Sequence, residues 1–438
     1  MRQLLIAISK RYPLVRVLRH HYVIMRNNVS WLRHVSPLQK RTVVFQAYNG
    51  RYTCSPKAIY ESMLKDERYA NYSFIWVVRD ATRYKTLARK PRTTLVTYRS
   101  REYFKAFATA KYWVVNGMLP LRITKRPGQV MVQCWHGTPL KRLRHDIIED
   151  TQNAMNSRQD FIRKNLIDAR RYDYFISPSK FATEKFISAF GIERMQQKGR
   201  ILEIGYPRND ALHRSSERSI SKLKKQFGVP EDKTVVLYAP TWRDDQHDAR
   251  VGYTHKNQLN FSALQRDLGS KYIVLFRAHY LIANQFDFKQ HDGFVIDVSD
   301  HDDINDLYLV SDALITDYSS VMFDYANLGK PMLFYMYDQE HYEHRLRGFY
   351  FSAHELPGEI IKTQTTLTKR LQHLDTYTEK YAKPYDAFAR KYTYLDDGKA
   401  AKRLLGALFD PPPSRRPAHA SKSKSESILS TTNQAGAL

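Results

Sequence analysis

Asp312 to Tyr335 has the sequence DALITDYSSVMFDYANLGKPMLFY, in which two short apolar runs flank a helical pattern. The first run ends in a polar turn at Asp317 to Ser320, and Gly329 and Pro331 end the helical pattern before the second run. Short apolar runs separated by amphipathic stretches are typical of a parallel sheet covered by helices. This stretch therefore predicts a strand, a helix and a second, parallel strand.

The same alternation continues on both sides of this stretch. The predicted strands are, in chain order, TVVFQA (42–47), SFIWVV (73–78), TTLVTY (93–98), YWVVNG (112–117), QVMVQCWHG (129–137), YFISPS (174–179), TVVLYAP (234–240), YIVLFRAH (272–279), GFVIDV (293–298), DALITD (312–317) and PMLFYM (331–336). A chain of 438 residues favours two domains of roughly 150 to 200 residues each. The predicted fold class is α/β, with two Rossmann-like αβα domains facing each other across a cleft where ligands bind.

The domain bounds follow from changes in composition along the chain. Residues 41–204 form the predicted N-terminal domain and residues 205–410 the C-terminal domain. Gly205 to Asp210, GYPRND, lies at the changeover and predicts a hinge because it is rich in turn residues. Residues 411–438 begin PPPSRRP and are then rich in Ser and Lys, which predicts a disordered tail.

Residues 1–40 contain eight Lys or Arg and no acidic residue. Apolar residues recur there at helical spacing, interrupted near Pro13, which predicts a helix with an apolar stripe beside a basic face. These residues are Leu4, Leu5, Ile8, Tyr12, Val15, Leu18, Tyr22 and Met25. Such a helix suits the headgroup layer of an anionic membrane. The alternative is a basic helix packed on the body of the protein.

The charge balance predicts a polyanionic partner, because 70 Lys and Arg against 44 Asp and Glu give a formal charge of +26. The basic residues are dispersed and no aromatic-basic RNA or DNA motif occurs, so we expect no nucleic acid partner. Cys54 and Cys134 are too few for a disulfide framework, which favours a reducing compartment. The chain shows no signal peptide and no run of about 18 apolar residues. We therefore expect a peripheral protein on the cytoplasmic face of the cell membrane.

Catalytic groups are expected where a strand ends at the cleft. The segment QCWHGTPLKRL, Gln133 to Leu143, places His136 there, and Gly137, Thr138 and Pro139 predict a turn into a helix. Histidine accepts a proton from a hydroxyl near neutral pH, so His136 is the predicted general base. The alternative is a histidine that only satisfies the turn.

Three strand ends of the second domain predict an anion site. Pro240, Thr241 and Arg243 follow one strand, and Arg277 and His279 follow another. A hydroxyl group, guanidinium groups and an imidazole at these ends suit the oxygens of a diphosphate.

The third strand end is followed by the polar turn Asp317 to Ser320. Asp317, Ser319 and Ser320 offer polar side chains at the start of a helix, a typical anion site. Asp324 lies one helical turn after Ser320, so its carboxylate is predicted on the same side, where it could hold a ribose hydroxyl. Together these residues predict a site for a nucleoside diphosphate. The alternative is a serine cap, with Asp324 complementing the helix dipole.

The acidic stretch SDHDDINDLYLVSD contains Asp300, Asp302 and Asp303, whose carboxylates could ligate a metal ion. It fits better as the acidic start of the helix that leads to Leu309. We therefore predict no metal site, and the absence of a nucleophile elbow argues against covalent catalysis.

Several of these segments together resemble the CDP-glycerol glycerophosphotransferase family of teichoic acid synthesis. The similar segments are WHGTPLK (135–141), GYPRND (205–210), YAPTWRD (238–244), ITDYSSVMFDYANLGKP (315–331) and RGFYF (347–351). The resemblance covers about Thr42 to Leu408. It implies a GT-B-like fold and a transfer without cofactor or metal, in which a hydroxyl of a lipid-linked acceptor attacks the β-phosphorus of CDP-glycerol and expels CMP.

The resemblance also implies residue roles. His136 corresponds to the proposed base, and His279 with Arg277 to the residues that bind the diphosphate. The positions that correspond to donor binding are Gly137, Thr138, Pro139, Leu140, Arg208, Pro240, Thr241, Ser319, Ser320 and Asp324. The N-terminal domain would bind the acceptor and the C-terminal domain the donor. One departure is Tyr280, since the family often has proline after this histidine.

Several alternatives stay open from the sequence. The chain could be a primase or a polymerase, could use CDP-ribitol, or could build a capsule polymer. A homo-oligomer is also left open. A non-catalytic envelope scaffold and a nucleic-acid-binding protein are more distant alternatives, and the presence of both His136 and His279 argues against the scaffold.

Overall fold

The structure is a computed structural model that describes residues 36–147, 158–192, 200–241, 247–248, 252–253, 259–278, 288–340 and 348–409, with Leu14, Val15, Val17, Leu18, His21, Tyr22 and Met25. The predicted tail at 411–438 and most of the predicted helix before residue 36 lie outside the described residues.

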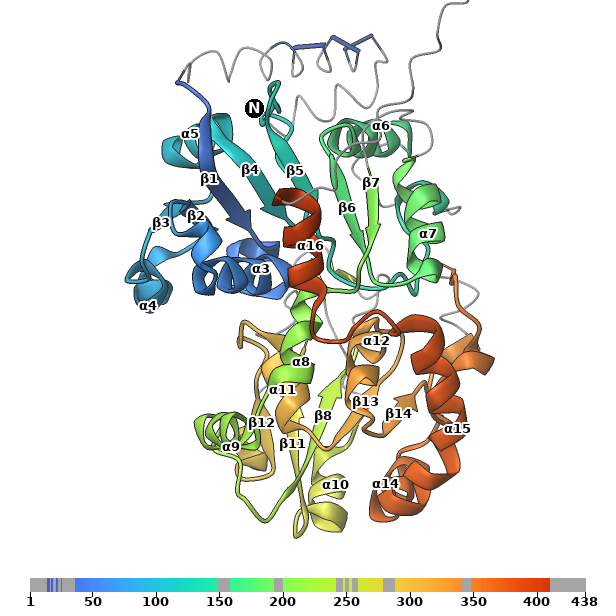
Figure 1. Ribbon diagram of the computed structural model, residues 1–438. Helices are drawn as coiled ribbons and strands as arrows, with labels where there is room; N and C mark the ends of the chain where they lie inside the picture. Colours follow the sequence, from blue (N-terminus) through green and yellow to red (C-terminus); the bar gives the residue numbers. More distant parts are fainter. Residues whose placement is uncertain are drawn as a thin grey trace, which may run out of the picture.

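The first domain contains a seven-stranded parallel sheet with the order β3-β2-β1-β4-β5-β6-β7 (Figure 1). Its strands are β1 (Gln39–Gln46), β2 (Ser73–Val78), β3 (Thr93–Thr97), β4 (Ala110–Val115), β5 (Val130–Gln133), β6 (Tyr174–Ser177) and β7 (Arg200–Glu203). Its helices are α3 (Cys54–Lys65), α4 (Lys85–Ala88), α5 (Arg101–Thr109), α6 (Arg158–Ala169) and α7 (Lys180–Phe190). The strand order reverses between β1 and β4, the kind of position where doubly wound sheets bind ligands.

The second domain repeats this design with a six-stranded parallel sheet in the order β12-β11-β8-β13-β14-β15. Its strands are β8 (Thr234–Ala239), β11 (Tyr272–Phe276), β12 (Val295–Asp297), β13 (Ala313–Thr316), β14 (Met332–Tyr335) and β15 (Ile360–Ile361). Its helices are α9 (Glu217–Gln226), α10 (Phe261–Leu268), α11 (Ile304–Val310), α12 (Val321–Tyr325), α14 (Gln364–Gln372) and α15 (Leu374–Tyr392). A separate antiparallel pair consists of β9 (His247–Asp248) and β10 (Gly252–Tyr253). The strand order of the six-stranded sheet reverses between β8 and β13.

The predicted fold class is confirmed, because every predicted strand forms and both sheets are parallel and doubly wound. Strands β7 and β15 of the two sheets were not predicted, and neither was the separate β9–β10 pair. β7 has the sequence RILE, with a charged residue at each end, and β15 contains only two residues at the edge of its sheet. Such short edge strands carry too little apolar pattern to be recognised.

Alternation along the strands places the core on both faces of each sheet. In β1, Val43 and Phe45 pack in the cluster that contains Trp76, whereas Val44 packs with Trp113 in the cluster on the other face. All five side chains are buried. A strand buried on both faces has a continuous apolar sequence, which is why these runs could be predicted.

The chain crosses between the domains twice, and the two crossings are hydrogen-bonded to each other. After the predicted hinge, α8 (Asp210–Arg214) enters the second domain, and the carboxylate of Asp210 accepts bonds from the amides of Ala400 and Ala401 at 2.9 Å each. Gly205 has a φ of 81°, and a Cβ there would lie 2.5 Å from the carbonyl oxygen of Leu395. The hinge thus needs glycine for close approach as well as for its backbone conformation.

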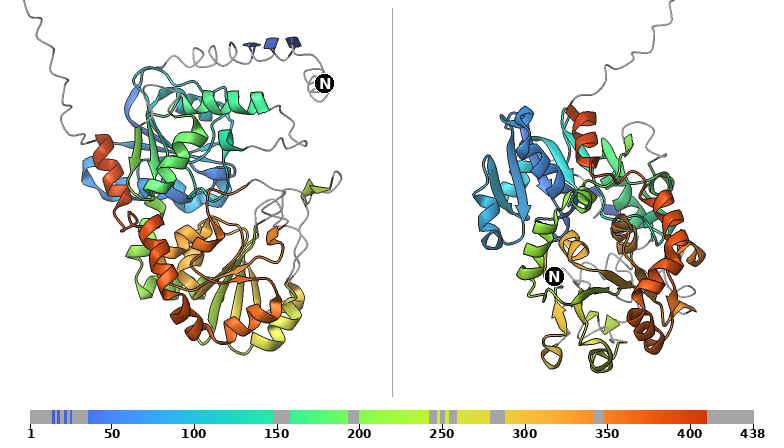
Figure 2. Two further views of the ribbon diagram at one scale, coloured as in Figure 1. Left: turned by 90° about the vertical axis from the view of Figure 1, so that its right-hand side faces the viewer. Right: turned by 60° about the horizontal axis from the view of Figure 1, so that its bottom comes forward.

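The second crossing returns the chain to the first domain, where α16 (Ala400–Phe409) lies beside α3 (Figures 1 and 2). The predicted domain bounds place this helix in the second domain, within residues 205–410, whereas its contacts are with the first. Leu404 and Leu405 are buried in the core of the first domain, and the Phe409 ring contacts those of Tyr69 and Tyr112. The helix is amphipathic, but nothing in its sequence specifies which domain covers its apolar face.

Candidate functional site

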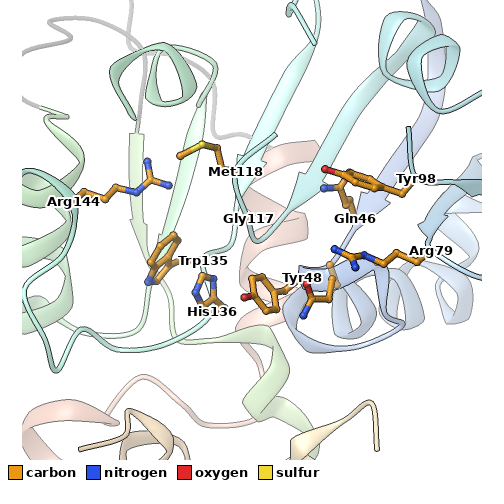
Figure 3. Close-up of a pocket in the computed structure, with 12 residues that line it drawn as sticks. Gln46, Tyr48, Arg79, Tyr98, Gly117, Met118, Trp135, His136 and Arg144 are labelled. Atoms are coloured by element: carbon orange, nitrogen blue, oxygen red, sulfur yellow. The ribbon is translucent and has the colours of Figure 1, made fainter. Parts of the chain in front are cut away.

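The carboxyl ends of the two sheets meet at a cleft between the domains. Tyr48, Asn116 and His136 follow β1, β4 and β5, while Arg277 and Ser320 follow β11 and β13, and all five line a cavity of about 290 Å³. A second cavity of about 220 Å³ lies between the loops that carry His136 and Ser320. A third, of about 330 Å³, lies within the first domain (Figure 3). His136 lines all three cavities.

The position of His136 assigns roles to its two ring nitrogens. Its Nδ1 atom lies 2.9 Å from the backbone carbonyl oxygen of Asn116. Because a carbonyl oxygen only accepts, Nδ1 carries the proton and Nε2 holds a lone pair. The ring contacts those of Trp135 and Tyr48, with centroid distances of 4.0 and 5.5 Å, and the side chain remains exposed to the cleft (Figure 3). His136 is therefore oriented to accept a proton.

The surroundings of His136 favour its neutral form. The pKa of His136 is lowered to about 4, mainly because the surrounding protein desolvates the ring. The bond to Asn116 raises the pKa, whereas the positive charges of Arg208 and Arg144 contribute to lowering it. The side chain is exposed at the cleft, and contact with solvent there offsets part of the desolvation. His136 is neutral at pH 7, which is the form that a general base requires.

The loop after His136 crosses from the first domain into the second. The predicted helix after Thr138 is wrong, since residues 137–143 contain no helix. The side chain of Leu140 packs in the core of the second domain. A helix packed on the first domain would prevent this contact, so no helix forms here. A Cβ on Gly137 would lie 2.9 Å from the Oγ of Ser320. The domains thus touch at this loop, and glycine permits the approach.

Arg208 joins the hinge to both halves of the site. One terminal nitrogen donates to the two carboxylate oxygens of Asp324 at 2.7 and 2.6 Å, and the other donates to the carbonyl oxygen of His136 at 2.7 Å. Asn209 donates a further bond to Asp324. The predicted ribose contact of Asp324 stays a prediction, and in the structure its carboxylate holds Arg208 beside His136.

The second domain presents a guanidinium group and hydroxyl groups to the cleft. The amide and Oγ1 of Thr241 both donate to Oδ1 of Asp317, at 2.9 and 2.8 Å, so Asp317 fixes the turn after β8. Arg277 donates to the carbonyl oxygens of Val298 and His301, at 3.3 and 2.8 Å. Because α12 contains only five residues, side chains rather than a long helix dipole supply the positive charge here.

Most of the predicted site residues come together in the structure. One cavity is lined by His136, Gly137, Thr138, Pro139, Leu140, Thr241, Ser319 and Ser320. The other cavity between the domains is lined by His136, Arg208, Arg277, Ser320 and Asp324. Pro240 is buried directly before Thr241. Arg243 and His279 lie outside the described residues, although Ala278, which precedes His279, lines the cleft.

Two contributors were missed from the sequence. Asn116 acts through its backbone carbonyl group, so its side-chain type gives no signal, although its position at the end of β4 could have drawn attention to it. Tyr48 follows β1 and contacts the His136 ring. Aromatic residues are frequent in this chain, and contact between distant loops has no sequence spacing by which to recognise it.

The acidic stretch caps α11, as predicted. The side chain of Asp303 accepts a bond from the amide of Asn305. Asp303 also pairs with Lys57 of α3 at 2.6 Å, and Asp300 pairs with Arg51 at 2.9 Å. These acids therefore connect the second domain to the first beside the cleft.

Comparison with known proteins agrees with this arrangement. The family model described as CDP-Glycerol:Poly(glycerophosphate) glycerophosphotransferase matches residues 28–410. The chain is 40% identical over 376 residues to the teichoic acid poly(glycerol phosphate) polymerase of Bacillus subtilis (strain 168), covering 85% of the chain and 49% of that protein. It is 38% identical over 376 residues to the teichoic acid glycerol-phosphate transferase of Staphylococcus aureus (strain NCTC 8325 / PS 47), covering 84% of the chain and 93% of that protein.

The chain thus spans about half the length of the Bacillus subtilis relative. A solved structure of the wall teichoic acid polymerase TagF, a variant soaked with CDPG, superimposes with a TM-score of 0.79 at 37% identity and covers 90% of this chain and 95% of that one. This similarity confirms the GT-B-like fold that the sequence implied. The chain belongs to the CDP-glycerol:poly(glycerophosphate) glycerophosphotransferase family.

Proposed function

We propose that this chain transfers glycerol phosphate from CDP-glycerol to a lipid-linked wall polymer in teichoic acid synthesis and releases CMP. The observation that carries the proposal is the neutral His136, whose Nδ1 is bonded to Asn116 and whose Nε2 is open to the cleft between the domains. Its family membership and its relatives, which are named for glycerol phosphate transfer, support the same reaction.

In the proposed reaction, a hydroxyl oxygen of the acceptor attacks the β-phosphorus of CDP-glycerol while Nε2 of His136 takes the hydroxyl proton. The bond between this phosphorus and the bridging oxygen breaks, and CMP leaves with the bonding electrons. Arg277 and the hydroxyl groups of Thr241 and Ser320 bind the diphosphate, with His279 as a further ligand. Phosphoryl transfer depends mainly on positioning and charge stabilisation, which these groups supply.

The proposed location is the cytoplasmic face of the membrane. Within the described parts of the chain, no helix has both the length and the apolar character that a membrane crossing requires. Leu14, Leu18 and Met25 are 73%, 61% and 60% exposed, in a segment rich in basic residues. Figure 1 places this segment at the end of the first domain away from the second. These features support contact with an anionic surface.

The experiment that tests the activity offers purified protein a lipid-linked acceptor with either CDP-glycerol or CDP-ribitol. Mass analysis of the product then gives the donor used and the number of units added. We expect glycerol phosphate units with CDP-glycerol and CMP in equal amount. Addition of ribitol phosphate alone would replace the proposed donor with CDP-ribitol, and release of CMP without any product would contradict transfer. The number of units added separates a primase from a polymerase.

A further inference from the structure

The cavity of about 330 Å³ within the first domain, here called the first-domain cavity, is separate from the cleft cavity proposed for the donor, although Tyr48 and His136 line both. Its size is in the range of small-molecule sites. It is lined by Gln46, Ala47, Tyr48, Asn49, Gly50, Arg79, Tyr98, Gly117, Met118, Trp135, His136 and Arg144. This set contains two arginines and no acidic residue, so the cavity favours an anion. Figure 3 shows Arg79 and Arg144 extending toward it from opposite sides.

Arg144 has a hydrogen-bond donor that could bind a ligand. Its side chain is 7% exposed and packs on the rings of Trp135 and Phe190, with its guanidinium carbon 5.3 and 4.2 Å from their centroids. Its Nη1 atom is buried and makes no hydrogen bond within the part of the chain that the structure describes. A buried donor without a partner is costly, and such groups often await a ligand.

The ion pair between Arg144 and Asp168 involves Nη2 of Arg144 and not Nη1. Asp168 lies 3.8 Å from Arg144, but its carboxylate already accepts a bond from Arg171 at 3.1 Å and one from Tyr172 at 2.5 Å. Asp168 is thus shared among Arg144, Arg171 and Tyr172, and within the described residues Nη1 of Arg144 is left without a hydrogen bond.

The backbone around the cavity is held in unusual conformations. Trp135 has a φ of 48° and Arg144 a φ of 44°, in the left-handed region that residues other than glycine seldom adopt. Each such residue costs about 1 to 3 kcal/mol, a strain that often accompanies functional positions. Gly50 lies close to Arg79, because a Cβ on Gly50 would lie 2.8 Å from the Arg79 amide nitrogen. The backbones that carry the two arginines are thus constrained, one by a left-handed conformation and the other by close packing against Gly50.

We propose that the first-domain cavity binds the terminal polyol phosphate unit of the acceptor, with Arg144 holding its phosphate group and Arg79 adding positive charge on the opposite side of the cavity. This inference rests on the proposed function. His136 lines both this cavity and the cleft cavity that holds the donor. A phosphate held by Arg144 leaves the hydroxyl at the other end of the same polyol free to reach Nε2 of His136. The rings of Tyr48 and Trp135 contact the His136 ring, and both side chains line the first-domain cavity.

The test compares Arg144→Met and Arg79→Met with the wild type in steady-state kinetics, using an acceptor that ends in glycerol phosphate. We expect the KM for this acceptor to rise about tenfold or more in each variant, since bonds to charged groups are the strong ones. The KM for CDP-glycerol, and CDP-glycerol binding measured by calorimetry, should stay within about twofold. Arg79 is exposed, so its variant folds even if loss of the buried Arg144 destabilises the domain. Arg89→Met, an exposed arginine of the same domain away from the cavity, is the matched control and should behave as wild type.

A second acceptor, the lipid-linked disaccharide without glycerol phosphate, identifies the anion. The arginine variants should lose much less activity with it than with the acceptor that ends in glycerol phosphate. Equal losses with both acceptors, or a raised KM for CDP-glycerol, would overturn the proposal while leaving the transferase activity intact. Failure of the wild-type protein to transfer any glycerol phosphate would instead refute the proposed function itself.

Discussion

At the scale of single residues, the bond between His136 and Asn116 and the lowered pKa of His136 fix the protonation state of the proposed base. Protonation of Nε2 would abolish its function, and the lowered pKa moves that event below the ordinary value of 6.5. We therefore expect kcat/KM to stay level from pH 8 to pH 6.5 and to fall only at lower pH, as His136 becomes protonated. A pH profile with CDP-glycerol checks this. An acidic limb centred at or above pH 6.5 would contradict the assignment.

The Arg208–Asp324 pair provides a second prediction at this scale. Both side chains are almost fully buried, at 7% and 6% exposure, so Asp324→Asn leaves a buried guanidinium without its carboxylate. We expect a loss of about 3 to 5 kcal/mol in the free energy of unfolding in urea. The matched control is Asp386→Asn, whose exposed pair with Arg390 should contribute less than about 1 kcal/mol. Equal effects of the two substitutions would show that burial does not set the strength of the pair.

Sequence reasoning found His136, Arg277 and Ser320 because a polar side chain at the end of an apolar run is visible in the sequence. It could not find the carbonyl group of Asn116, since every residue has one. Helical spacing predicted that the Asp324 carboxylate binds a ribose hydroxyl, whereas in the structure this carboxylate accepts bonds from Arg208 and Asn209 of the hinge. Contacts between distant segments have no sequence spacing, so they could not be predicted.

At the scale of elements, α16 connects the end of the described chain to the first domain. Leu404 is fully buried there, so Leu404→Ala should create a cavity and reduce the free energy of unfolding by about 2 to 5 kcal/mol. Lys402→Ala, on the exposed side of the same helix, should change it by less than about 0.5 kcal/mol. Urea unfolding of both variants checks this, and an unchanged stability of the Leu404 variant would contradict the observed packing.

The elements themselves were largely predictable. Strands buried on both faces have continuous apolar sequences, so β1, β8 and β13 could be recognised from the sequence. The loop from Gly137 to Leu140 could not be recognised, because its Pro and Leu residues suit a helix. Leu140 crosses the cleft because its side chain packs in the core of the second domain. The return of α16 to the first domain was missed for the same reason, since it depends on a partner that lies far away in the sequence.

At the scale of the whole molecule, the exposed apolar residues before residue 26 and the charge of +26 predict binding to anionic membranes. Leu18→Asp should reduce the fraction of protein that sediments with anionic vesicles about tenfold or more, because it removes an exposed leucine that would insert into the membrane and adds repulsion from the anionic lipids. Ser221→Asp adds the same charge to an exposed position in α9 and should have little effect. Equal sedimentation of the Leu18 variant and the wild type would rule out this contact.

The most direct test of the molecule as a two-domain transferase is CMP release by His136→Ala, measured with CDP-glycerol and a lipid-linked acceptor alongside CDP-glycerol binding. Loss of the base should reduce turnover about a hundredfold or more, while the second domain still binds the donor within a fewfold of wild type. His354→Ala, an exposed histidine outside the cleft, serves as the control and should retain full turnover. Turnover by the His136 variant at the wild-type rate would contradict the account.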